Sequence, residues 1–198
     1  LHSDTEMDRL YLVGLGDQSL KDFRAAGAAL GRKVRGRAVN LISLLPLKKS
    51  EVKAHAISIV LGAYTWNLKT TTPAEIPSFT IATNEVEALA EANSVAEALV
   101  LTRDLIHTPS NIKNPLWMAQ QAKKVADEKG LSIKVLEGKE IAQFGGLVAV
   151  CMSSHNPGPR FIELSYIPKK IAKSKVKSAT ALPHIVIVGK GITYDTGG

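Results

Sequence analysis

A lysine and an aspartate lie close together in a glycine-rich segment of the sequence. Lys190 and Asp195 are five residues apart. The glycines around them are Gly189, Gly191, Gly197 and Gly198. Aspartate is a hard oxygen ligand for metal ions, and a lysine amine can ligate once the cation displaces its proton. The spacing alone leaves three interpretations open: a turn with a solvated lysine, a phosphate-binding loop and a metal site. The phosphate loop fits least, because the order is not Gly-x-x-x-x-Gly-Lys followed by Ser or Thr.

The residues before Lys190 are expected to form a strand that places Lys190 and Asp195 at the edge of a sheet. Ile185 to Val188 form an unbroken apolar run rich in β-branched residues, bounded by Pro183 and Gly189. This pattern predicts a buried strand. Ligands of α/β sheets bind just beyond the carboxyl ends of strands. We therefore expect Lys190 and Asp195 to point into one pocket at such an end.

The same segment resembles the signature of a known enzyme family. Residues 188–198 read Val-Gly-Lys-Gly-Ile-Thr-Tyr-Asp-Thr-Gly-Gly. This is similar to the signature of the leucyl (cytosol) aminopeptidases, the M17 metallopeptidases, with Tyr194 in place of phenylalanine. Residues 103–115 and 146–160 also resemble stretches of that family, with His107 where asparagine is usual. The similarity is clear from about residue 85 to 198 and looser over the first 82 residues.

The resemblance implies that two metal ions support the hydrolysis of N-terminal residues, preferably leucine, from peptides in the cytoplasm. Asp195 matches the aspartate that bridges both metals, and Lys190 matches the lysine whose neutral amine ligates one of them. Zinc or manganese suits such a mixed nitrogen and oxygen site. The family is typically hexameric. Its other metal ligands and its site arginine match nothing before Gly198, so no catalytic or substrate-binding residue is assigned. We expect the 198-residue chain alone to be inactive and to bind metal weakly or not at all.

The alternation of strand and helix patterns predicts an α/β fold with two domains. Residues 1–82 are predicted to form the first, and the resemblance implies a small macro-like domain. Its expected strands are 10–15, 38–44 and 78–82, and its expected helices are 19–34 and 50–66. Residues 83–198 are predicted to form a linker helix over 84–106, broken near Asn93, and the first part of an α/β metallopeptidase catalytic domain. That part should have a mostly parallel sheet. Its expected elements are helices 115–129 and 139–144, a turn at 145–146 and strands 131–136 and 161–166.

Charge suggests an alternative function. The net charge is +7, and five lysines lie within residues 168–177. The simplest interpretation is a solvated loop between two strands. The alternative is a non-catalytic, macro-like module that binds nucleotides or nucleic acid. No aromatic residues interleave with these lysines, so the run has no stacking platform for single strands.

The remaining features are typical of a cytoplasmic globular protein. The single cysteine, Cys151, allows no internal disulfide. No stretch of about eighteen apolar residues predicts a membrane span, and residues 1–7 do not resemble a secretory signal. Tyr64 and Trp66 are predicted to be packing residues, and His107 is predicted to be a helix cap or surface group.

Overall fold

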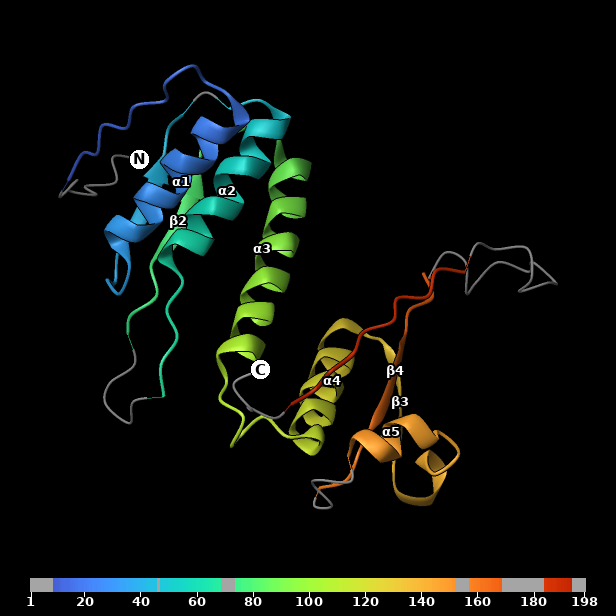
Figure 1. The fold of residues 1–198 in the computed structure, drawn as a ribbon. Coiled ribbons are helices and arrows are strands. Elements are labelled where there is room, and N and C mark those ends of the chain that lie inside the picture. The colour runs from blue at the N-terminus through green and yellow to red at the C-terminus, as the bar shows by residue number, and fades with distance from the viewer. Residues whose placement is uncertain (1–8, 46, 69–73, 152–156, 169–183, 194–198) are drawn as a thin grey trace. The chain divides into compact units, whose positions relative to one another are not determined.

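The computed structural model describes residues 9–45, 47–68, 74–151, 157–168 and 184–193. The chain divides into two compact units, Leu1–His107 and Thr108–Gly198 (Figure 1). The first contains α1 (Leu20–Val34), β1 (Asn40–Ser43), α2 (Lys49–Ala63), β2 (Ser78–Ile81) and α3 (Val86–His107). The second contains α4 (Pro115–Lys129), β3 (Ser132–Leu136), the 3-10 helix η1 (Gly138–Ile141), α5 (Gly145–Val150) and β4 (Phe161–Ser165). The predicted α/β class is confirmed.

Helix α1 begins where the sequence predicts, because Ser19 forms a complete capping box. The backbone N–H of Asp22 donates to the Ser19 hydroxyl, and the Ser19 backbone N–H donates to the Asp22 carboxylate over 3.0 Å. These bonds satisfy two donors that a helix start otherwise leaves unpaired. The hydrogen bonds from Ser19 hold the pKa of Asp22 below its usual range.

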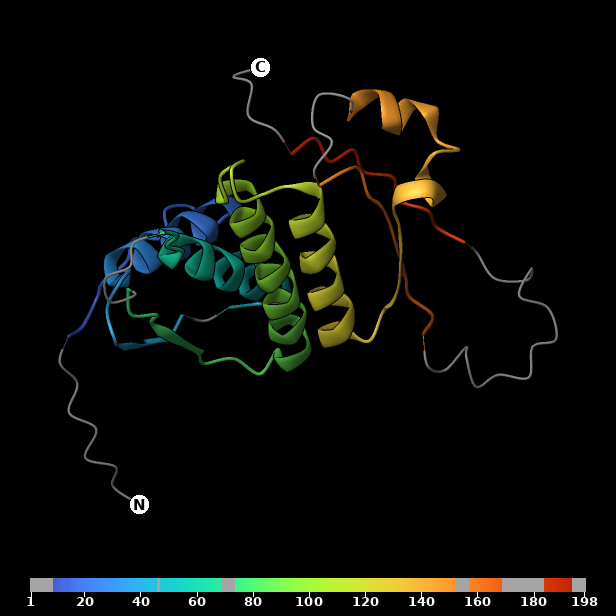
Figure 2. The ribbon, with the colours of Figure 1, turned by 90° about the horizontal axis from the view of Figure 1, so that it is seen from below.

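Helices α1 and α2 pack at very close range through glycines. Gly27 and Gly31 are one turn apart on α1 and face α2, where Gly62 approaches Ala28. A Cβ added to Gly31 would lie 2.1 Å from the Ile59 carbonyl oxygen. Both helices lie over one face of the β1–β2 pair (Figures 1 and 2). Only a residue without a side chain fits at these helix contacts.

The small sheet of the first unit is parallel, as expected for strands joined by a helix. β1 pairs with β2 from Asn40 opposite Ser78 to Ser43 opposite Ile81. The predicted strand over 10–15 is wrong for this structure: these residues have no regular structure, and Leu12 is 91% exposed. The apolar run is present, but no strand of the described residues pairs with this segment. A strand needs such a partner for its backbone hydrogen bonds.

A buried histidine on α2 connects this helix with β1 and α1. His55 on α2 is fully buried, and its Nε2 lies 3.1 Å from the hydroxyl of Ser43 on β1. Its Nδ1 lies 3.3 Å from the carbonyl oxygen of Phe23 on α1. Because that carbonyl can only accept, Nδ1 carries the proton and the Ser43 hydroxyl donates to Nε2. Burial lowers the pKa of His55, and the Phe23 carbonyl offsets part of this effect.

We expect the first unit to lose stability as the pH falls below about 6.5, the ordinary histidine value. The unfolded chain then binds a proton that native His55 resists, so the free energy of unfolding falls until the pH reaches the lowered native pKa. One such group gives a slope of at most about 1.4 kcal/mol per pH unit. Urea unfolding followed by Trp66 fluorescence in a Trp117→Phe background measures it. A His55→Gln variant should show a shallower dependence, and an equal slope in both proteins would contradict the assignment.

Helix α3 packs on α2 with a stripe of alanines. Ala88, Ala92 and Ala96 are at most 3% exposed, at the four-residue spacing of one helix face. Lys53 on α2 and Glu91 on α3 form an ion pair beside this stripe. The predicted break near Asn93 is wrong, because the helix continues unbroken and the Ser94 hydroxyl donates to the Ala90 carbonyl. These contacts group α3 with the first unit. The domain boundary predicted between 82 and 83 stays a prediction.

The second unit contains an antiparallel strand pair with α4 against it. β3 pairs with β4 from Ser132 opposite Ser165 to Leu136 opposite Phe161. The mostly parallel sheet expected for residues 83–198 is therefore wrong for this strand pair, the one that the described residues of this unit form. Gly145 and Gly146 begin α5, where the sequence predicts a turn. Helix α4 begins and ends as predicted, with Gly130 in the left-handed conformation at its C-terminal cap.

Candidate metal centre

The structure describes one of the two predicted metal ligands. Lys190 lies in an irregular segment, residues 184–193, and is exposed. Asp195 lies outside the described residues, so its distance from Lys190 stays a prediction. The run before Lys190 is not the buried strand that the sequence predicts: Ile187 and Val188 are 92% and 90% exposed. No strand among the described residues pairs with this run, which leaves its apolar side chains open.

The chemistry of the donors fits part of a metal site. An amine from Lys190 and a carboxylate from Asp195 are groups that zinc and manganese both accept. Two donors are too few for a pair of ions, each of which takes four to six ligands. Among the residues that the structure describes, no three His, Cys, Asp or Glu side chains lie close enough to hold a metal. The site therefore needs donors beyond the described residues.

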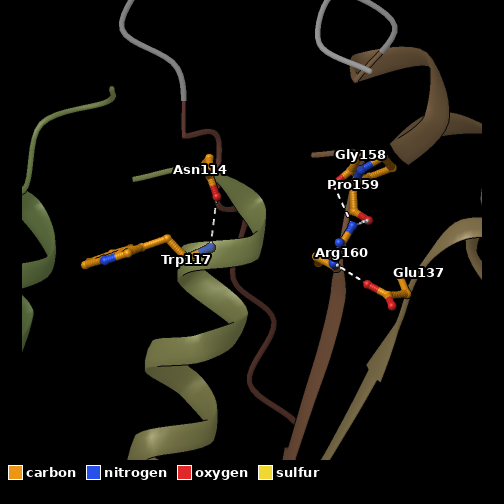
Figure 3. A network of polar contacts seen from close by, with 6 residues as sticks. All are labelled: Asn114, Trp117, Glu137, Gly158, Pro159 and Arg160. Carbon is orange, nitrogen blue, oxygen red and sulfur yellow. Dashed lines mark hydrogen bonds and ion pairs between the residues drawn. The ribbon is translucent and has the colours of Figure 1, made fainter. Parts of the chain in front are cut away.

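An arginine lies near one end of the strand pair of the second unit (Figure 3). Its Nε lies 2.7 Å from a carboxylate oxygen of Glu137, just after β3, and its Nη1 donates to the carbonyl oxygens of Gly158 and Pro159. This residue, Arg160, precedes β4, and its side chain is only 13% exposed. The rings of Phe144 and Phe161 stack 5.4 Å apart beside it. The ion pair joins the end of β3 to the start of β4.

A capped helix start gives α4 its direction (Figure 3). The side-chain oxygen of Asn114 accepts a hydrogen bond of 2.9 Å from the backbone N–H of Trp117, and Pro115 occupies the first helical position. Both features are preferred at helix starts. The sequence predicts this start correctly, because the signal is local.

The family of the chain follows from comparison with known proteins. A model of the cytosol aminopeptidase family, catalytic domain, matches residues 100–198, half of the sequence. The chain belongs to the cytosol aminopeptidase family. The match includes Lys190, Asp195, the β3–β4 strand pair and α4.

Curated relatives carry the similarity over almost the whole chain. A probable cytosol aminopeptidase of Aquifex aeolicus is 33% identical over 208 residues, 98% of this chain and 40% of the relative. One from Geobacter sp. strain M21 is 34% identical over 210 residues, 96% of this chain and 41% of the relative. The chain thus spans about 40% of the length of the curated relatives that it matches.

Solved structures agree on the fold. The bottromycin maturation enzyme BotP aligns with a TM-score of 0.68 and 32% identity, over 78% of this chain and 36% of that one. The same enzyme in complex with Mn aligns with a TM-score of 0.66 and 30% identity, over 79% and 36% of the two chains. A tomato leucine aminopeptidase mutant, 22% identical with a TM-score of 0.62, supports the fold alone.

Several predicted features lie outside what the structure describes or are tested only in part. Most of the lysine run falls within residues 169–183, so its solvation and the nucleic-acid alternative stay predictions. Cys151 is free, in agreement with the expected absence of a disulfide. In the described ranges, no helix is both long and apolar enough to cross a membrane.

Proposed function

We propose that the full-length protein is a metal-dependent aminopeptidase, the function its family match supports best. One observation carries the proposal: Lys190 and Asp195 stand five residues apart inside the segment that the catalytic-domain model matches. The manganese complex of the 30% identical enzyme BotP supports a divalent ion for this chain too. Two ions, manganese or zinc, would be held in part by the Lys190 amine and the Asp195 carboxylate.

When bound, such ions supply a Lewis acid for the scissile carbonyl and lower the pKa of a bound water. The contribution of this chain is to place the two donors on one short segment. Lys190 can donate its lone pair only as a neutral amine, so its surroundings in the complete site must favour loss of the proton. A divalent site that also holds a free α-amine would restrict the enzyme to peptide N-termini.

The finer properties are proposed on the resemblance. We infer a preference for leucine, a cytoplasmic location and a hexamer, as expected from the family signature in residues 188–198. The named functions of the solved neighbours differ, one a bottromycin maturation enzyme and one a leucine aminopeptidase, so the side-chain preference needs direct measurement. The 198-residue chain alone is proposed to lack activity, since it supplies two donors of the set.

Hydrolysis of leucine-p-nitroanilide by the full-length protein tests the proposal. We expect activity that a chelator removes and that manganese or zinc restores, with no hydrolysis of the N-acetylated substrate. The same assay with other N-terminal residues measures the preference, and the 198-residue chain run in parallel should show no hydrolysis. Chelator-resistant activity, or equal hydrolysis of the blocked substrate, would contradict a metal-dependent aminopeptidase.

A further inference from the structure

A pocket in the first unit lies at the carboxyl end of α2. Its volume is about 380 Å³, and its walls include Arg35, Tyr64, Trp66, Arg103 and His107. Arg35 follows α1 directly, while Arg103 and His107 belong to α3. Ligand pockets in proteins have volumes of about 300–1,000 Å³. The pocket is therefore large enough for a small molecule, and it shares no residue with the candidate metal centre.

Two arginines converge on the end of α2. Arg35 donates from Nε and Nη2 to the carbonyl oxygen of Gly62, over 3.1 and 2.7 Å. Arg103 donates from Nη1 to the carbonyl oxygen of Leu61 over 3.0 Å. Helix α2 has no basic residue in its own last turn, so these arginines offset the negative end of its dipole. A guanidinium has five N–H donors, and these bonds use two from Arg35 and one from Arg103. Both guanidinium groups therefore have N–H donors beyond those used in these bonds, which a further acceptor could use.

The other wall of the pocket is aromatic. The ring of His107 stacks on Tyr64 and on Trp66, with centroid distances of 5.7 Å in both pairs. His107 Nδ1 donates to the carbonyl oxygen of Arg103 over 2.9 Å, which fixes the orientation of the ring.

The charge of the pocket is positive. Its walls and their contacts include two guanidinium groups and one carboxylate, that of Asp104, which accepts a hydrogen bond of 2.8 Å from the Tyr64 hydroxyl. Burial, together with the hydrogen bond and charge of Asp104, raises the pKa of Tyr64 to about 12. The hydroxyl thus stays protonated at neutral pH, and its proton remains directed at Asp104. An anion entering the pocket would meet the arginine forks.

We propose that this pocket binds a small oxyanion, a carboxylate or a phosphate group, between Arg35 and Arg103 and beside Trp66. Guanidinium forks match the geometry of both groups, and charge-assisted hydrogen bonds are about twice as strong as neutral ones. The flat wall formed by Trp66 and His107 would then take the apolar part of the ligand. If the arginines served only as caps for α2, they would stabilise the helix without any response to anions.

Trp66 fluorescence gives a direct test, because the chain has only two tryptophans. In a Trp117→Phe background of the 198-residue chain, inorganic phosphate and acetate are titrated separately, with chloride at matched ionic strength as the control. We expect a saturable change with at least one of the two anions and a Kd in the millimolar range. Phosphate alone or acetate alone would identify the preferred group, and either result supports the site. A response equal to that of chloride overturns it.

Substitutions of arginine by glutamine distinguish anion binding in the pocket from a general effect of the positive charge of the protein. Arg35→Gln and Arg103→Gln should each weaken binding about tenfold, the loss expected for one charge-assisted pair. Arg24→Gln removes the same charge from an exposed position on α1 and should bind like the parent. An equal loss in Arg24→Gln would overturn the proposal. If the capping arginines prove necessary for folding, as circular dichroism would show, the titration of the parent decides the question because both caps remain. A saturable change with phosphate or acetate that chloride does not produce supports the site, and a response equal to that of chloride rejects it.

Discussion

Gly31→Ala is expected to destabilise the first unit by about 3 kcal/mol or more, at the upper end of the range for overpacked cores. The added methyl group would lie 2.1 Å from the Ile59 carbonyl oxygen and 2.8 Å from the Ala63 backbone nitrogen. Both are backbone atoms of α2, so no side-chain rotation relieves the clash and the helices must separate. Alanine also favours helix over glycine by up to about 1 kcal/mol, which offsets only part of the loss. Urea unfolding, followed by Trp66 fluorescence in the Trp117→Phe background, measures the change.

The same substitution at an open position provides the control. Gly14 lies in the irregular segment before α1 of the same unit, and a Cβ there would meet no atom within 4 Å. Gly14→Ala should therefore change stability by less than about 1 kcal/mol. Gly62→Ala, whose Cβ would lie 2.5 Å from the Ala28 carbonyl oxygen, should behave like Gly31→Ala. Equal urea midpoints for Gly31→Ala and the parent would show that the two helices do not pack as closely as described.

Helices could be predicted from the sequence because their signals are local. Ser19 and Asn114 begin α1 and α4, and Gly130 ends α4, since each acts on backbone groups within a few residues. The break wrongly predicted in α3 also came from local signals. Asn93 and Ser94 lower helix propensity, but three buried alanines pack against the neighbouring α2, and tertiary packing outweighs a weak local preference.

The strands that pair could be predicted as segments, but the direction of their pairing could not. Residues 132–136 and 161–165 are strands as expected, yet they run antiparallel to each other. The apolar runs around Leu12 and Ile187 have strand patterns but no partner among the described residues. Pairing joins residues far apart in the chain, and the period-two pattern of one strand carries no information about its neighbour.

The candidate metal centre and the pocket at the end of α2 differ in how much of each the sequence could reveal. Lys190 and Asp195 could be proposed from the family signature, because both lie in one segment of the sequence, and their role as metal ligands stays a prediction. The pocket at the end of α2 could not, because Arg35, Tyr64 and Arg103 come together only through the packing of three helices. The Gly27 and Gly31 spacing was the one available signal of close helix contact. His55 gave no signal, as a histidine among apolar helix residues does not reveal its partners.

Lys190→Ala in the full-length protein is expected to lower kcat/KM by more than a hundredfold. Changing merely an outer partner of a metal ligand can cost about 10- to 100-fold, and Lys190 is proposed to be a ligand itself. Lys190→Arg should be as inactive as Lys190→Ala, although it keeps the positive charge. A guanidinium does not lose its proton in proteins, so it has no lone pair to give to a cation. The pair of variants therefore separates ligation from simple electrostatic attraction of the substrate.

Hydrolysis of leucine-p-nitroanilide and bound metal per protein, measured by elemental analysis, provide two independent readouts. Both should fall in Lys190→Ala and Lys190→Arg. Lys134→Arg is the matched control, since Lys134 is an exposed lysine on β3 and the same replacement there should leave both readouts unchanged. If Lys190→Arg kept its activity and its metal, the lysine would act through its charge alone. The metal centre would then have to be built from the carboxylate of Asp195 and from donors elsewhere in the full-length protein.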